Sequence, residues 1–354
     1  MRLTGFKYLW VDALCIVQGP RGDWTTESAK MADVYGGAFL TISAAISLDV
    51  QHGFQESLTE HFQSLKKRKL HPTFNPLYGR GWALQERILS PRVLIFGKGG
   101  MFWECREYAS LSYMQGKSFP YIPRDRCLRL KQACGYEDWM TIVEDYTKRS
   151  LTHKRDTFPA LSGCAMLYHQ FTKHDYLAGM WKQSLLPELL WKTYIPSNSE
   201  TVLPSKYIAP SWSWASCDHF VVYNKDRLRN TAKVINAQIE LKDPEAPFGQ
   251  VTSGSIVLCG PLVPESEIDR QDITAWNDIS EAQRPHGKIW YMLLCMDLVG
   301  QGHGLILQNG KGAKQTCFAR TGVFAIWGQM RWGSPPARSL KPFQECEHRT
   351  ITII

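Results

Sequence analysis

The segment RGWALQERILSPRVLIFG, which begins at Arg80, places an aromatic ring and a carboxylate four positions apart. If a helix begins near Gly81, Trp82 and Glu86 lie on one face of it, one turn apart. An aromatic ring beside a carboxylate could stack on a base or a nicotinamide ring and stabilise positive charge that develops at a sugar carbon, as glycosidic bond cleavage requires. We therefore predict Glu86 as a candidate catalytic residue and Arg80, Trp82 and Gln85 as candidate ligand-binding residues.

The same residues also fit a purely structural interpretation. Trp82 would then be a core side chain, and Glu86 would form an ion pair with Arg80 or Arg87. The residue types alone leave both interpretations open.

A second group of candidate residues lies in the apolar run YLWVDALCIVQ, which begins at Tyr8. We predict a buried parallel strand over Tyr8–Ala13 whose carboxyl end opens into a loop, because such runs form the strands of parallel sheets and ligands collect at that edge. An isolated carboxylate inside such a strand is costly. Asp12 therefore either contacts a ligand or accepts backbone N–H bonds that hold the loop.

Cys15 and Gln18 continue this run and are added to the predicted ligand-binding residues. Cys15 is either a reactive thiol beside the predicted cleft or a packed core cysteine. None of the ten cysteines forms a CxxC pair or a Cys/His cluster with zinc spacing, so no metal site is predicted.

The elements that must position these residues form a predicted strand–helix–strand unit. The helix carries an apolar stripe formed by Met31, Val34, Tyr35 and Ala38. The second strand is FLTISAA, by its β-branched and aromatic content, and VLIFGKGGMFWEC predicts a hairpin at its glycine-rich turn. Residues 1–108 are therefore expected to form an α/β domain.

The rest of the chain changes pattern twice. Residues 109–136 are predicted as an irregular connector and residues 137–206 as a helical region. The latter has two apolar stripes and a third helix over LAGMWKQSLLPELLW. Residues 207–354 contain several strand patterns and are expected to form a mostly antiparallel β region. The predicted fold class is α+β overall.

Composition narrows the class of protein further. A chain of 354 residues with 44% hydrophobic and 21% charged residues is typical of a globular protein with more than one domain. No apolar stretch is long enough to span a membrane, no secretory signal is recognisable, and the scattered cysteines favour a reduced, cytoplasmic location. The cluster Lys66–Lys69 carries part of the net charge of +8, but no nucleic-acid-binding module accompanies it, so a nucleic-acid partner is not expected.

Several of these segments resemble the heterokaryon incompatibility (HET) domain of fungi. The resemblance rests on YLWVDALCIVQ, MADVYGGAFLTISAA and RGWALQERILSPRVLIFG with FWEC, and it continues through YTKRSLT, DTFPALSGCA, YLAGMW, LLW, APSWSWAS and the terminal TITII. It implies an intracellular fungal protein of non-self recognition and regulated cell death. Such a protein would act by signalling, with a protein partner or by self-association.

The HET domain is itself thought to be distantly related to the Toll/interleukin-1 receptor (TIR) fold. Some members of that fold cleave NAD at the nicotinamide glycosidic bond with a helix glutamate that follows a tryptophan by four residues, the spacing of Trp82 and Glu86. The resemblance therefore implies a partial TIR-like N-terminal domain. It also implies a possible NAD glycohydrolase activity, in which NAD is a substrate and no cofactor is needed.

The resemblance also implies a segment that is not found in this sequence. HET domains open with a strand of the form YxxLSYxWG well before the strand that corresponds to Tyr8–Ala13, whereas this chain begins at Met1. We therefore expect an N-terminally truncated domain. A truncated, inactive paralogue is a third interpretation of its function.

Overall fold

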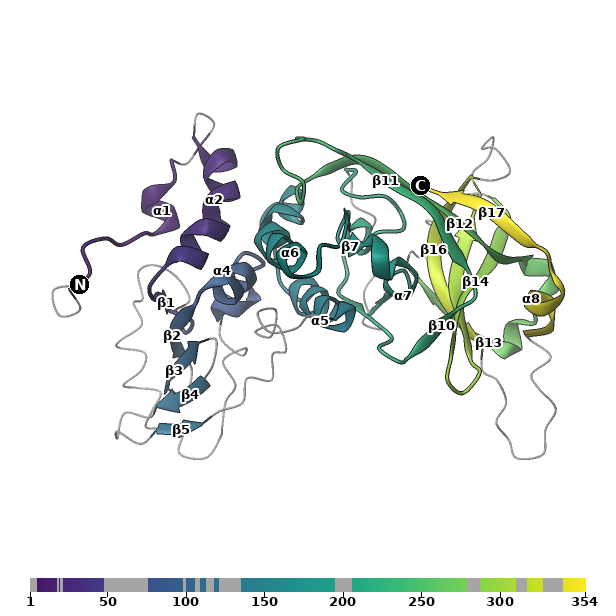
Figure 1. Ribbon diagram of the computed structural model, residues 1–354, viewed down its shortest axis with the longest axis horizontal. Coiled ribbons are helices and arrows are strands. Elements are labelled where there is room, and N and C mark those ends of the chain that lie inside the picture. Colours follow the sequence, from purple (N-terminus) through teal and green to yellow (C-terminus); the bar gives the residue numbers. More distant parts are fainter. Residues whose placement is uncertain are drawn as a thin grey trace.

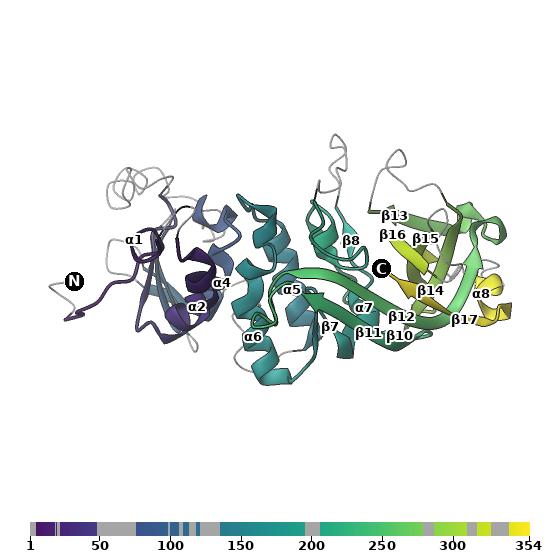
Figure 2. The same ribbon diagram turned by 90° about the horizontal axis from the view of Figure 1, so that it is seen from above.

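The structure is a computed structural model that describes residues 5–17, 19, 22–47, 76–97, 100–105, 109–112, 118–120, 135–194, 206–278, 287–309, 317–326 and 340–354. Three regions follow one another along the long axis of the molecule: an N-terminal α/β region, a central helical region and a C-terminal β region (Figure 1). The view from above shows the same order (Figure 2). The chain is thus mixed α and β, as predicted. The basic cluster Lys66–Lys69 and the candidate residue Gln18 lie outside the described residues.

The N-terminal region is a five-stranded sheet with helices beside it. In sheet order the strands are β1 (Thr41–Ser43), β2 (Arg92–Gly97), β3 (Gly100–Cys105), β4 (Ala109–Ser112) and β5 (Ser118–Pro120). Strand β1 is parallel to β2 and the other pairs are antiparallel. The predicted β2–β3 hairpin is confirmed. The prediction of an irregular connector is wrong for β4 and β5. Backbone pairing of β4 with β3, and of β5 with β4, extends the sheet even through polar residues.

The predicted strand over Tyr8–Ala13 is wrong. The chain is extended without strand pairing as far as Val11 and then forms a short helix, α1 (Asp12–Cys15). Several of its apolar side chains are exposed, with 91% of Tyr8 and 82% of Leu14 accessible, whereas Trp10 and Val11 are partly buried. An apolar run becomes a buried strand only if neighbouring strands and helices cover both of its faces. In the described part of the chain no strand pairs with this run, so the predicted strand–helix–strand unit lacks its first strand.

Helix α2 (Trp24–Gly37) and helix α4 (Ala83–Leu89) connect the sheet to the rest of the molecule. Both pack against the central helix α6 (Pro159–Thr172). Gly163 of α6 has no room for a larger side chain, because a Cβ atom there would lie 2.7 Å from Leu89 and 3.0 Å from Ala32. The close approach of these three helices ties the N-terminal region to the central one.

The two apolar stripes predicted for the central region are confirmed. Helix α5 (Tyr136–Thr147) and helix α6 bury every residue of their stripes: Trp139, Ile142, Val143 and Tyr146, and Leu161, Cys164, Ala165 and Tyr168. Helix α6 begins at Pro159, a residue suited to a first helical position because its missing N–H would have no partner there.

The third predicted helix of this region is wrong. Its sequence forms the hairpin β6 (Tyr176–Leu177) and β7 (Met180–Trp181), followed by the one-turn helix α7 (Leu185–Glu188). The hairpin turn uses left-handed backbone at Ala178 and Gly179, with φ angles of 44° and 93°. The apolar side chains of this sequence are therefore buried around a hairpin and a short helix, and they do not lie along one face of a long helix.

The C-terminal region confirms the predicted, mostly antiparallel β structure. Two short strands, β8 (Lys192–Thr193) and β9 (Val221–Val222), pair before it. Its strands are β10 (Leu228–Asn230), β11 (Lys233–Leu241), β12 (Val251–Pro264), β13 (Ile273–Asn277), β14 (Ile289–Asp297), β15 (Gly302–Gln308), β16 (Cys317–Ile326) and β17 (His348–Ile353). Strand pairing runs in a ring through β12, β14, β15, β16 and back through β17 to β12. This sheet is therefore closed on itself.

The closed sheet buries apolar residues on both faces. Met292, Leu294 and Leu305 belong to a large core that continues into the central helices, whereas Tyr291 and Phe324 belong to a smaller core. Helix α8 (Lys341–Glu345) covers the smaller core with Phe343. Among the described residues, no helix combines the length and the apolarity that a membrane crossing requires.

Candidate functional site

Glu86 of α4 is the centre of a cluster of charged and polar side chains. Its carboxyl group is partly buried and shares a hydrogen bond with the hydroxyl group of Tyr35. The pKa of Glu86 is raised to about 7, mainly by burial and also by the nearby Asp12. The pKa is lowered by Arg80, by the hydrogen bond from Tyr35 and by Arg149, which only partly offset the rise. The structure thus brings together three of the predicted residues, Asp12, Arg80 and Glu86.

Arg80 is held in place by pairing with a distant part of the chain. It forms a parallel bridge with Ser150, and the neighbouring Gly81 N–H donates to the Ser150 carbonyl oxygen at 2.8 Å. The Ser150 N–H donates in turn to the Gly79 carbonyl oxygen at 2.7 Å. A Cβ atom at Gly81 would lie 2.5 Å from Leu151 Cδ2, so a larger residue there would have to displace the Leu151 side chain. The backbone contact with Ser150 sets the start of α4, and therefore the direction in which Glu86 projects.

Tyr35 belongs to this cluster although the sequence analysis assigned it only to an apolar stripe. It lies on α2, and its ring contacts Trp10 edge to face at 5.6 Å between centroids. Burial raises the pKa of the Tyr35 hydroxyl, and the Glu86 charge raises it further. Tyr35 therefore keeps its proton and donates a hydrogen bond to the Glu86 carboxylate.

Arg149 is a second member of the cluster that sequence reasoning missed. Its side chain is buried, and one end, Nη2, binds Asp145 at 2.8 Å. Among the described residues, its Nε and Nη1 atoms have no hydrogen-bond partner. These unpaired donors are of the type that binds an anionic or carbonyl oxygen, although both atoms are shielded from solvent. The signal in the sequence was the segment YTKRSLT, which lies far from Glu86 along the chain.

Asp12 stands at the start of α1 and not at the end of a strand. The residue is partly buried, and its Oδ1 atom accepts a hydrogen bond from the Ala13 N–H at 2.7 Å. Carboxylates are favoured in the first turn of a helix, because they complement the free N–H groups there. This local contact fits the structural interpretation of Asp12. Its effect on the pKa of Glu86 shows that it also lies near the candidate site.

Trp82 and Gln85 each form a hydrogen bond with a residue outside the Glu86 cluster. Trp82 forms a hydrogen bond with Asp156 and packs against the large core. Gln85 is 1% exposed, and its Oε1 atom accepts a hydrogen bond from the Gly163 N–H at 3.2 Å. These contacts are those of packing residues. A ligand-binding role for Trp82 and Gln85 remains a prediction.

Cys15 is exposed, and its sulfur accepts a hydrogen bond from the Val11 N–H at 3.5 Å. The interpretation of Cys15 as a packed core residue is therefore wrong. Its predicted role in ligand binding stays a prediction. Gln18 lies outside the described residues.

A buried ion pair also joins α4 to the sheet of the N-terminal region. Arg87 Nε and Nη2 donate to the two carboxylate oxygens of Glu104 at 2.8 and 2.6 Å, and both side chains are at most 5% exposed. Arg87 thus joins α4 to β3. Of the two arginines considered as partners of Glu86, Arg80 is the one that lowers its pKa.

The cluster has the elements of an acid–base site. A carboxyl group with a pKa near 7 exchanges its proton at physiological pH, which suits a general acid or base. Its ionised form can stabilise positive charge, while Arg149 offers donors to an oxygen. Among the described residues, no group of three or more His, Cys, Asp or Glu side chains is placed to hold a metal ion.

The N-terminal region also exposes several large apolar side chains. Besides Tyr8 and Leu14, these are Leu9, Val17, Phe39 and Ile42, each at least 55% accessible. We call these six side chains the N-terminal apolar residues. They lie on α1, on the segments directly before and after it, and on or beside β1, which is the edge strand of its sheet among the described residues.

Comparison with known proteins finds one family model that is similar to the first quarter of the chain. Residues 1–86 match the family model described as Heterokaryon incompatibility protein (HET). The matched segment ends at Glu86 and includes Asp12, Tyr35 and Arg80. It confirms the resemblance over these residues, and the resemblance of the later segments stays a prediction. No curated protein and no solved structure matches the chain.

Proposed function

We propose that the protein acts in fungal heterokaryon incompatibility as a signalling component that binds another protein chain through its N-terminal apolar residues. The match of residues 1–86 to the HET family model supports a role in heterokaryon incompatibility. The observation that supports protein binding is the exposure of these side chains, which reaches 91% at Tyr8.

Exposed apolar side chains that gather in one region mark contact sites, because their removal from water is favourable. Strand β1 adds a second feature. It is paired only on its β2 side among the described residues, so its outer edge offers backbone groups to an incoming strand. Ile42 of β1 is 55% exposed and lies within that edge.

A growth assay tests this proposal. Overexpression in a filamentous fungus should arrest growth, and Leu14→Glu should relieve the arrest by placing a charge in the apolar contact. Leu298→Glu is a matched control, because Leu298 is 81% exposed against 82% for Leu14 and lies in the distant turn between β14 and β15. Normal growth with abundant soluble wild-type protein, or equal arrest by both variants, would contradict the proposal.

A second candidate function is hydrolysis of NAD at its nicotinamide glycosidic bond, and the pKa of Glu86 near 7 favours it. In this reaction the bond between the sugar carbon and nicotinamide breaks, and nicotinamide leaves with the bonding electron pair. The Glu86 carboxylate would stabilise the positive charge on the sugar. A water molecule then adds to the sugar carbon and loses a proton, which yields ADP-ribose.

The nicotinamide released from NAD measures this activity directly. Since the ionised carboxylate is the active form, the rate should rise with pH through about 7 and should fall at least about 100-fold in Glu86→Gln. Equal release by wild type and Glu86→Gln, or no release at all, would rule out this second function. The two candidates are distinguished because growth arrest by signalling alone persists in Glu86→Gln.

A further inference from the structure

A cavity of about 850 Å³ lies in the C-terminal half of the chain, outside the segment that matches the HET family. One wall is the loop 206–217, the other is the β11–β12 hairpin, and β16 lies at the base. The size falls in the range of small-molecule binding sites. Its apolar lining comes from Ile208, Ala209, Pro210, Ile239 and Ala319.

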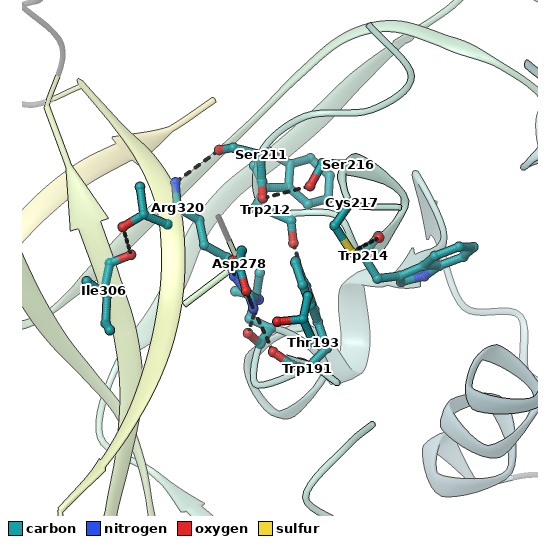
Figure 3. Close-up of polar contacts among 12 residues, drawn as sticks. Trp191, Thr193, Ser211, Trp212, Trp214, Ser216, Cys217, Asp278, Ile306 and Arg320 are labelled. Atoms are coloured by element: carbon teal, nitrogen blue, oxygen red, sulfur yellow. Dashed lines mark hydrogen bonds and ion pairs between the residues drawn. The ribbon is translucent and has the colours of Figure 1, made fainter. Parts of the chain in front are cut away.

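The charged groups at the base of the cavity neutralise one another. Arg320 Nε and Nη2 bind the two carboxylate oxygens of Asp278 at 2.8 and 3.2 Å (Figure 3). The Arg320 guanidinium also donates to the carbonyl oxygens of Leu189 and Trp191, both at 2.6 Å, and lies 3.3 Å from the centroid of the Trp191 ring. The base thus presents a closed ion pair, and a charged ligand would meet no free counter-charge there.

Three polar side chains of the cavity are poorly suited to act as nucleophiles. Burial raises the pKa of the Cys217 thiol to about 12, so the thiolate that would react is absent at neutral pH. The Ser211 hydroxyl donates to the Ile354 carbonyl oxygen and accepts from the Arg320 N–H. The Ser216 hydroxyl donates to the Ser213 carbonyl oxygen at 2.7 Å. These contacts favour binding without covalent chemistry.

The mouth of the cavity carries one charge of each sign. Lys206 and Glu240 both line it and are both exposed. The Glu240 carboxylate accepts a hydrogen bond from Ser253 at 2.8 Å. These two side-chain charges are opposite in sign and by themselves favour neither an anion nor a cation.

From the size, the apolar lining and the closed ion pair, we infer that this cavity is a binding site for an uncharged, largely apolar small molecule. The ligand would contact the loop 206–217, which packs on the central helices through Trp214, and the strands β12 and β16. Its binding would therefore link the central region to the closed sheet. This site is independent of the proposed function of the N-terminal region.

Two fluorescent probes with the same aromatic skeleton test the inference. N-phenyl-1-naphthylamine is uncharged, whereas 1-anilinonaphthalene-8-sulfonate differs from it by one sulfonate group. The uncharged probe should bind the full chain saturably and at least tenfold more tightly than the sulfonate. Equal or tighter binding of the sulfonate, or no saturable binding of the uncharged probe, would overturn the inference.

Filling the cavity should remove this binding. The double variant Gln238→Trp/Ala319→Trp places two large rings at lining positions, and at least a tenfold loss of affinity is expected. The matched control is Asn236→Trp/Ala275→Trp, because Asn236 is exposed on the same strand as Gln238 and Ala275 is exposed on β13. Neither control residue lines the cavity, so wild-type affinity is expected. Wild-type affinity in the filled variant would show that the probe binds elsewhere.

Hydrogen exchange locates the probe without any substitution. The uncharged probe should slow amide exchange in the loop 206–217 and in residues 253–255 of the wild-type chain. This measurement keeps the test decisive if the filled variant does not fold. Protection confined to residues 5–17, where the N-terminal apolar residues begin, would assign the probe to that surface and contradict a site in this cavity.

Discussion

The hydroxyl group of Tyr35 on α2 donates a hydrogen bond to the carboxylate of Glu86 on α4, so two helices meet at a titratable pair. The tyrosine favours the ionised form of Glu86, whereas burial favours the protonated form more strongly. The balance leaves the pKa of Glu86 at about 7. The N-terminal region therefore contains a carboxyl group whose charge changes at physiological pH.

Glu86 should make the protein less stable as the pH rises. Its pKa is raised from 4.5 to about 7, so the native state binds the proton more tightly than the unfolded state and loses this advantage across that window. At about 1.4 kcal/mol per pKa unit the full effect is about 3 kcal/mol, which partial exposure of the side chain reduces. We expect Glu86→Gln to be more stable than wild type by about 1–3 kcal/mol at pH 8 and nearly equal to it at pH 4.5.

Urea unfolding of both proteins across this pH range measures the difference directly. The comparison with Glu86→Gln isolates this residue, because Asp156, Asp278 and Glu188 also have raised pKa values and contribute equally to both proteins. If the difference in the free energy of unfolding between wild type and Glu86→Gln does not change with pH, the raised pKa of Glu86 is contradicted.

Tyr35→Phe should raise the pKa of Glu86 above its value in the wild type. The substitution removes the hydrogen bond that favours the carboxylate and leaves the ring in place. A rise of about 1 unit is expected, given the usual strength of a hydrogen bond to a charged group. The midpoint of the Glu86 carboxyl carbon signal in an NMR titration measures it. Tyr194→Phe serves as the control, because Tyr194 is 57% exposed and distant in the fold; an equal midpoint in both variants would exclude the hydrogen bond.

The ion pair of Arg87 and Glu104 should be detectable when one partner, and then both, are replaced. Arg87→Met leaves the Glu104 carboxylate buried without its partner, which costs about 3–5 kcal/mol of stability. Removal of both charges in Arg87→Met/Glu104→Leu avoids that cost, so the double variant should be more stable than the single one. Urea unfolding gives both free energies. A double variant that is less stable than Arg87→Met would show that the pair is not the reason for the loss.

The helices of the central region could be predicted from the sequence because their signal is local. The stripe of α5 places Trp139, Ile142 and Tyr146 on one face, and a packed neighbour is enough to bury them. The run from Tyr8 had an equally strong apolar content, yet Tyr8, Leu9 and Leu14 are exposed. A buried strand depends on partners that are distant in the sequence, and the run itself carries no information about them.

The same distinction explains which members of the candidate site could be found. Glu86 and Arg80 share one short segment, so their spacing alone suggested a site. Arg149 reaches it through the contact of Gly81 with Ser150, a pairing between positions far apart in the chain. Tyr35 fitted an apolar stripe, and the periodicity of a helix does not show whether a tyrosine hydroxyl meets a carboxylate.

Gly179 should be among the least replaceable residues of the central region. Its φ angle of 93° is rare for residues with a side chain, and a Cβ atom there would lie 2.6 Å from Trp214 Nε1. The Gly179 carbonyl oxygen also accepts hydrogen bonds from the indole N–H groups of Trp139 and Trp214, at 3.0 and 2.9 Å. Gly179→Ala must therefore either strain the turn or displace an indole ring. We expect it to cost at least about 2 kcal/mol.

Gly36→Ala is the matched control for this prediction. Gly36 lies in α2, and a Cβ atom there would meet nothing within 4 Å. The same substitution should therefore stabilise the protein by about 0.5–1 kcal/mol through helix propensity. Thermal and urea unfolding of the two variants should shift in opposite directions. Since both replace glycine by alanine, equal shifts would show that the turn at Gly179 tolerates a side chain, and the close contact with Trp214 would then not hold the hairpin in place.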